Sequence, residues 1–166
     1  MDNQTVFECK YELDSLCGFL KLSRGYYDAT KDSCFMNGNW SAAIDQVFTV
    51  MEEQSQSTFD EDFNFVSYYN WTGTAGSLSP PVNNHGNGEP KAFTGLVGTH
   101  HRPSHDLRTY AFLTPVNAML SVQLSRLAGV LDDAGMFPNL SSSAREWSSQ
   151  ISAAIWNSTV SVSQSL

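Results

Sequence analysis

Four segments of the chain place apolar side chains at positions i, i+3, i+4 and i+7, a spacing that gives an α-helix one apolar face. The segments cover about residues 13–27, 40–54, 114–135 and 141–155. Their apolar stripes are Leu13, Leu16, Cys17 and Leu20; Ile44, Val47, Phe48 and Met51; Val116, Met119, Leu120, Leu124, Leu127, Ala128 and Leu131; and Trp147, Ile151, Ala154 and Ile155. Four helices in two pairs predict an all-α fold, either a bundle or a toroid.

The expected ends of these helices carry capping residues. Asn39 is the expected N-cap of the second helix, and Thr114-Pro115 has the order of an N-cap followed by a first helical proline. Gly135 suits the end of the third helix, because glycine readily adopts the left-handed conformation found there. The spacing of Ser143–Glu146 predicts a capping box at the start of the fourth helix.

A long connection, about residues 55–108, separates the two helix pairs. A connection of this length inside a compact domain is uncommon and is usually functional. Its aromatic residues predict that it packs onto the helices: Phe59, Phe63, Phe65, Tyr68, Tyr69 and Trp71. The segment Val66–Trp71 is a candidate short strand.

Composition limits the classes of function. The chain has 166 residues, of which 41% are hydrophobic and 16% charged, as expected for one globular domain. Its net charge of −8, without a basic run, argues against nucleic-acid binding, which needs a Lys/Arg patch. No apolar stretch reaches the roughly 20 residues of a membrane span, and residues 1–5 lack a signal-peptide pattern. We therefore expect neither a nucleic acid nor a membrane as partner.

Five Asn-X-Ser/Thr sequons favour a secreted glycoprotein. They begin at Asn3, Asn39, Asn70, Asn139 and Asn157. The cysteines leave the disulfide state open, because three is an odd number and no CxxC spacing occurs. A Cys17–Cys34 or a Cys9–Cys34 bridge is one interpretation, and buried free thiols are the other. The sequence does not fix the oligomeric state.

The densest polar cluster is the segment Thr99–Asp106, just before the third helix. Arg102 offers a planar fork of donors for vicinal hydroxyls or a carboxylate, and Asp106 can exchange a proton. A plain salt bridge between these two side chains is the alternative. His101 and His105 raise a metal site as a further alternative, which the proline between them disfavours because it interrupts a helix.

A second cluster, Tyr11–Ser15, lies where the first helix is expected to begin. Glu12 or Asp14 could point into a cleft and bind hydroxyl groups. The alternative is that both carboxylates simply interact with the N-terminal end of the helix dipole.

Three blocks of the sequence resemble a known family. Lys10–Cys17 reads KYELDSLC and matches the family's early motif. Gly95–Asp106, which ends in HRPSHD, resembles its RPSDD motif, and Thr109–Met119 resembles the block that follows. The family is the metal-independent exo-α-1,6-mannosidases, glycoside hydrolase family 125. The resemblance extends from Val6 to about Trp156.

The resemblance implies that the chain is part of an (α/α)₆ toroid, the fold of six-hairpin glycosidases, with one long irregular loop. It implies inverting hydrolysis of terminal α-1,6-mannosides, with a mannose-containing glycan as partner and without a metal or other cofactor. Inverting glycosidases use one carboxylic acid to protonate the leaving oxygen and a second carboxylate to activate water. We expect residues 1–166 to be one incomplete catalytic domain, with irregular tails at residues 1–5 and 158–166.

Carried onto this sequence, the resemblance makes Asp106 the expected general acid, while His105 occupies the neighbouring position where the family has an aspartate. The implied substrate-binding residues are Arg102, Ser104, Tyr110, Asn117, Glu12 and Asp14. The family's general base lies beyond the end of this chain, and its Trp-Leu-Arg-Asp segment has no counterpart before Val6. We therefore expect an internal part of a longer enzyme. A non-catalytic carbohydrate-binding relic of the same fold is the alternative.

Overall fold

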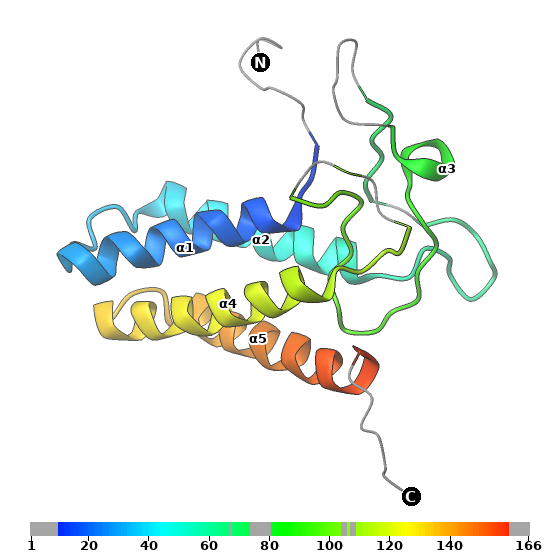
Figure 1. Cartoon of the computed structure of the whole chain (residues 1–166). Helices are drawn as coiled ribbons and strands as arrows, with labels where there is room; N and C mark the ends of the chain where they lie inside the picture. The colour runs from blue at the N-terminus through cyan, green and yellow to red at the C-terminus, as the bar shows by residue number, and fades with distance from the viewer. Residues whose placement is uncertain (1–9, 67, 74–80, 104–105, 107–108, 160–166) are drawn as a thin grey trace, which may run out of the picture.

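The computed structural model describes residues 10–66, 68–73, 81–103, 106 and 109–159 (Figure 1). Within them lie the helices α1 (Leu13–Thr30), α2 (Gly38–Ser55), α3 (Asn83–Gly86), α4 (Thr114–Ala134) and α5 (Pro138–Thr159). β-Structure in the described ranges consists of two isolated bridges, Phe59–Phe65 and Gly98–Phe112. The predicted all-α fold is confirmed.

Two details of the described residues follow from this assignment. The strand predicted at Val66–Trp71 is wrong for those of its residues that the structure describes. In the same parts of the chain, no helix is both long and apolar enough to cross a bilayer.

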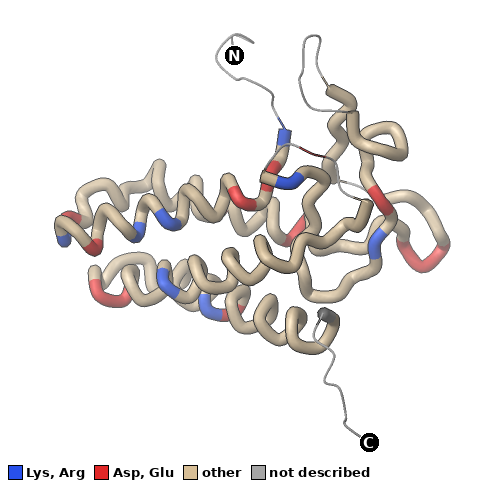
Figure 2. Tube along the Cα trace, viewed as in Figure 1, with Lys and Arg blue, Asp and Glu red and all other residues tan. Residues whose placement is uncertain are grey.

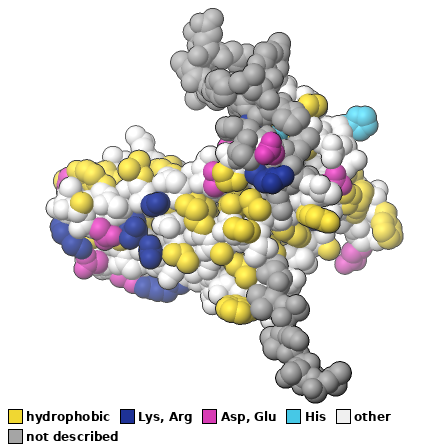
Figure 3. Space-filling view, in the orientation of Figure 1, with side chains coloured by type: hydrophobic (Ala, Val, Ile, Leu, Met, Phe, Trp, Pro, Cys, Tyr) yellow, Lys and Arg dark blue, Asp and Glu magenta, His cyan; other side chains and the backbone are white. Residues whose placement is uncertain are grey.

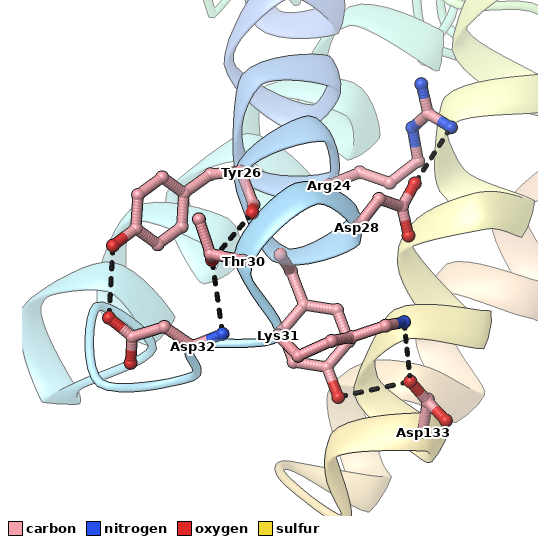
Figure 4. Close-up of polar contacts among 8 residues, drawn as sticks. Arg24, Tyr26, Asp28, Thr30, Lys31, Asp32 and Asp133 are labelled. Carbon is pink, nitrogen blue, oxygen red and sulfur yellow. Dashed lines mark hydrogen bonds and ion pairs between the residues drawn. The ribbon is translucent and has the colours of Figure 1, made fainter.

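Helices α1 and α4 pack side by side and run in the same direction (Figure 1). Near their C-terminal ends, the hydroxyl of Tyr27 on α1 donates to Oδ2 of Asp133 on α4 over 3.1 Å. Lys31 Nζ lies 3.2 Å from the same oxygen, so Asp133 joins the two helix ends (Figure 4). The parallel packing consequently places the N-terminal ends of α1 and α4 at one end of the molecule.

Each of these helices forms a hairpin with the long helix that follows it. Trp40 Nε1 on α2 donates to the buried hydroxyl of Ser23 on α1 over 3.0 Å. Between α4 and α5, the hydroxyl of Ser121 donates a hydrogen bond to the carbonyl of Ser148 at 2.9 Å, and the hydroxyl of Ser148 donates one to the carbonyl of Ser121 at 2.8 Å. Small serine side chains allow this close approach, so the two helices pack along much of their length.

The four predicted apolar stripes meet in one core. Its fully buried members from the long helices are Leu13, Cys17, Leu20, Ile44, Met51, Leu120, Leu124, Leu127, Ala128, Leu131, Ala144 and Ile151. Each large aliphatic side chain buried in this way contributes about 1.5–3 kcal/mol, so the core is the main source of stability.

Two predicted helix starts are wrong by a few residues. Asn37, rather than Asn39, caps α2, since its side-chain oxygen accepts from the backbone N–H groups of Asn39 at 3.0 Å and Trp40 at 3.1 Å. Helix α4 includes Thr114 as its first residue, with Leu113 in the capping position. The proline that follows Thr114 therefore occupies the second helical position.

At the ends of α4 and α5, one predicted helix boundary is confirmed and two are wrong. Gly135 ends α4 with a φ of 66°, as predicted. Helix α5 begins at Pro138, so the capping box expected at Ser143–Glu146 lies inside the helix and is wrong. At its other end α5 runs to Thr159, two residues into the tail expected at 158–166.

The long connection packs against the N-terminal ends of α1 and α4 (Figure 1). The N–H of Gly98 donates to the carbonyl of Gln54 at the end of α2, over 3.0 Å, and Lys91 Nζ donates to the carbonyl of Gln56 at 2.6 Å. Of the aromatic residues expected to pack down, Trp71 is buried, whereas Phe63 is 85% exposed. The prediction of a packed connection is therefore correct for only part of its aromatic content.

Asn117 fastens this connection to α4. Its side-chain oxygen accepts from the N–H of Val97 at 2.8 Å, and its Nδ2 donates to the carbonyls of Val97 at 2.9 Å and Leu113 at 3.2 Å. Both Asn117 and Val97 are fully buried. The Asn117 amide therefore satisfies backbone groups that would otherwise be buried without partners.

We predict that Asn117→Ala lowers the free energy of unfolding by about 2–4 kcal/mol, because it leaves the buried N–H and C=O of Val97 unpaired. Urea denaturation monitored by circular dichroism measures this loss. The control is Asn157→Ala, at an exposed position on α5. A loss for Asn117→Ala as small as that of the control would contradict the anchoring role.

Candidate functional site

The first motif lies where α1 begins. Glu12 occupies the N-cap position of α1, and its carboxylate lies 3.4 Å from Lys10 Nζ. The Lys10 and Glu12 side chains are only 6% and 11% exposed. Withdrawing two charges from water costs free energy unless they are paired in a well-formed site. Figure 2 shows charged positions of both signs at this end of α1 and on the adjoining loop.

Asp14 lies in the first turn of α1 with one carboxylate oxygen buried. Burial, together with the charge of Asp14, raises the pKa of the neighbouring Cys17 thiol to about 12. Cys17 is thus a protonated core thiol rather than a nucleophile. Cys17 and Cys34 are both free, so the Cys17–Cys34 bridge is wrong, while Cys9 lies outside the described residues.

Tyr69 joins the first motif to the long connection. The backbone N–H of Tyr11 donates to the Tyr69 hydroxyl over 2.7 Å, and the two rings meet edge to face with centroids 5.8 Å apart. The Tyr11 hydroxyl donates to the carbonyl of Gly98 at 3.0 Å. Burial holds the pKa of Tyr11 well above its ordinary value, so its hydroxyl stays a donor.

His100 stacks on Tyr69, with ring centroids 5.4 Å apart and planes inclined by 15°. Gly88 lies against the imidazole, where an added Cβ would come within 2.2 Å of Nδ1. Burial, reinforced by the charges of Lys91 and His101, lowers the pKa of His100 to about 4. The imidazole is therefore neutral at physiological pH.

The next residue, His101, is 1% exposed and packs edge to face on Trp71, with ring centroids 5.2 Å apart. The preceding Thr99 is held by its backbone N–H, which donates to the carbonyl of Ala111 at 2.9 Å. These contacts bury the first half of the polar cluster and fix its backbone.

In the second half of the cluster, the described residues are exposed. The backbone N–H of Arg102 donates to the carbonyl of Asp106 at 2.9 Å, and both side chains are exposed. Tyr110 is 77% exposed nearby in the sequence. Ser104 and His105 lie outside the described residues. Figure 3 shows acidic and basic side chains next to one another on this end of the molecule.

The structure thus separates the predicted site residues into two groups. Glu12, Asp14 and Arg102 belong to two segments that Tyr11, Tyr69 and His100 hold together. Asn117 is fully buried and serves as a backbone anchor, so its contact with substrate stays a prediction. The sequence did not predict that Tyr69 and His100 join the two segments. The aromatic residues of the long connection were the sequence feature that pointed to such contacts.

A hollow on the described surface lies away from the predicted site residues. It is an open groove of about 790 Å³ between α4 and α5, and none of the predicted site residues lines it. Beside His100 lie two cavities of about 10 Å³ each, which is room for about one water molecule. Tyr110 lines one of these two cavities.

Comparisons with known proteins match the whole chain. The profile of the metal-independent α-mannosidases, GH125, covers residues 1–166. The meiotically up-regulated gene 157 protein of Schizosaccharomyces pombe is 36% identical over 157 residues, which make up 93% of this chain and 31% of that protein.

A solved structure from Streptococcus pneumoniae gives the fold. It is a metal-independent α-mannosidase in a non-productive complex with α-1,6-mannobiose, with a TM-score of 0.80 and 22% identity. The match covers 96% of this chain and 36% of that chain, so the chain spans about a third of the length of these two relatives. The two hairpins are accordingly part of an (α/α)₆ toroid. The profile match over the whole sequence shows that this chain belongs to glycoside hydrolase family 125, the metal-independent α-mannosidases.

Proposed function

We propose that this chain supplies the acid-bearing wall of a glycosidase site that removes terminal α-1,6-linked mannose with inversion. The observation that carries the proposal is the junction of two blocks that resemble the family: the Tyr11 hydroxyl of the first donates to the carbonyl of Gly98 in the second, across 87 residues of sequence. The complex of the Streptococcus pneumoniae relative with α-1,6-mannobiose supports a mannose-containing glycan as the ligand.

The proposed chemistry places the general acid at Asp106. Its exposed position on the turn after His101 leaves the carboxyl group accessible to a glycosidic oxygen. Protonation of that oxygen lets the leaving sugar depart as the anomeric carbon develops oxocarbenium character. We assign the second carboxylate, which activates water, to the part of the longer relatives that this chain does not match.

Substrate recognition is assigned to residues around the acid. Arg102 offers paired N–H donors to vicinal hydroxyls, and Glu12 and Asp14 offer acceptors from the start of α1. Ser104 and Tyr110 complete the proposed wall with hydroxyl groups, and Tyr110 also presents an exposed ring. Two short segments that are far apart in the sequence thus supply both donors and acceptors to one sugar.

A non-catalytic carbohydrate-binding role is the second candidate. His105 favours it, because an imidazole replaces one of the paired aspartates of the family motif. Such a protein would bind the same mannosides through Arg102 and the α1 carboxylates without turning them over.

We predict that the chain binds α-1,6-mannobiose at millimolar concentration and that Arg102→Ala weakens binding about tenfold, because charge-assisted hydrogen bonds are lost. Asp106→Asn should leave the dissociation constant within about twofold and reduce any mannose release by about 10²–10⁴-fold. Calorimetry measures the binding, and NMR of the released anomer measures the turnover.

Glu146→Gln, at an exposed site on α5, is the matched control and should alter neither quantity. Release of mannose by a longer protein that also contains the water-activating carboxylate would favour the enzyme, and binding without release by that protein would favour the non-catalytic candidate. Absence of binding at millimolar ligand would refute both.

We also propose that the chain enters the secretory pathway and carries glycans, since the sequon asparagines Asn39, Asn70, Asn139 and Asn157 are exposed. Asn70 differs from the other three, because its Nδ2 donates to the carbonyl of His85 at 2.5 Å. Mass spectrometry of protein secreted from a eukaryotic host should find glycans on Asn39, Asn139 and Asn157 and none on Asn70. Secretion of an unmodified chain would contradict the proposal.

A further inference from the structure

Tyr69 lies in the long connection, outside the three sequence blocks that resemble the family, yet it contacts two of the motif segments. Its hydroxyl accepts the backbone N–H of Tyr11, one residue before Glu12, at 2.7 Å. Its ring stacks on His100, two residues before Arg102. A single half-buried side chain therefore spans from the first motif to the second.

A second hydrogen bond joins the same two segments. The Tyr11 hydroxyl donates to the carbonyl of Gly98, two residues before His100. Tyr11, Tyr69 and His100 thus form a bracket, in which each of the two motif segments is held at two points. Two separate attachments restrict rotation as well as distance, so the segments keep a fixed mutual orientation.

The side of the imidazole that faces the connection is also fixed. Gly88 has a φ of +78° and leaves no room for a Cβ beside His100. The charged and titratable groups around His100 include Lys91, His101, Glu53 and Glu89, of which Lys91 and His101 disfavour protonation of the imidazole. A neutral ring in a filled space keeps its stack on Tyr69 without repulsion from a charge.

We propose that Tyr69 is a positioning residue for mannoside binding, which sets the Glu12–Asp14 carboxylates against Arg102 by fixing Tyr11 and His100. The inference rests on the proposed function, because it concerns the same sugar-binding surface. Tyr69 itself need not contact the sugar. Tyr69 acts through its hydroxyl, which accepts the Tyr11 N–H, and through its ring, which stacks on His100.

The test compares Tyr69→Phe with Tyr68→Phe in the full chain. Tyr69→Phe removes one hydroxyl and keeps the ring, while Tyr68 is its 62% exposed neighbour and serves as the matched control. The expected result is about fivefold weaker binding of α-1,6-mannobiose for Tyr69→Phe, the effect of one lost hydrogen bond, and unchanged binding for Tyr68→Phe. Calorimetry is performed below the thermal transition of every variant, so that only folded protein is compared.

A spectroscopic readout separates positioning from general loosening. NMR should show the His100 imidazole titrating near pH 4 in the wild-type chain. Its pKa should stay there in Tyr69→Phe and rise towards the ordinary value of about 6.5 in Tyr69→Leu, which exposes the ring. If Tyr69→Phe does not fold, Tyr11→Phe replaces it, since that variant removes the bond to Gly98 on the other side of the bracket.

The outcomes distinguish the two proposals. Equal affinity of the wild-type, Tyr69→Phe and Tyr11→Phe chains for α-1,6-mannobiose would overturn the positioning role and leave the proposed function intact. A wild-type chain that binds no mannoside would remove the proposed function, and the positioning role with it. If the His100 pKa were the same in Tyr69→Leu as in the wild type, the Tyr69 ring would not be what keeps His100 buried, and the positioning role would be contradicted.

Discussion

The parallel packing of α1 on α4 is the constraint on which the rest of the structure depends. The shared carboxylate of Asp133 marks where the two helices end together. Their N-terminal ends consequently lie at the opposite end, which brings residues 10–14 close to the segment that leads into α4. The long connection covers this same end and supplies the side chains that join the two segments. Without the parallel arrangement, motifs that are more than 80 residues apart in sequence would have no common surface.

The titratable groups described near this end differ in their surroundings. Burial keeps Cys17 protonated in the core and His100 neutral. Asp106 is exposed, whereas Glu12 is nearly buried beside Lys10. The two carboxylates to which we assign the acid and a sugar contact therefore lie in different environments.

The sequence predicted what depends on local periodicity and missed what depends on distant contacts. The four apolar stripes were sufficient to predict the long helices, and Gly135 was sufficient to predict where α4 ends. The start of α2 was misplaced because Asn37 and Asn39 are equally good caps by composition, and only backbone geometry separates them. Sugar contact by Asn117 stays a prediction, and the sequence did not reveal that its amide bonds to Val97, 20 residues earlier. The Tyr69–His100 stack joins residues of one loop and has no sequence periodicity to reveal it.

The central claim is that residues 10–14 and 99–110 form one mannoside-binding surface at the N-terminal ends of α1 and α4. Its most direct test is the mapping of amide chemical shifts in the ¹⁵N-labelled chain during titration with α-1,6-mannobiose. The account predicts that amides of both segments shift together, with a common dissociation constant, while those of the groove between α4 and α5 do not move. Shifts confined to that groove, or to one of the two segments, would contradict it.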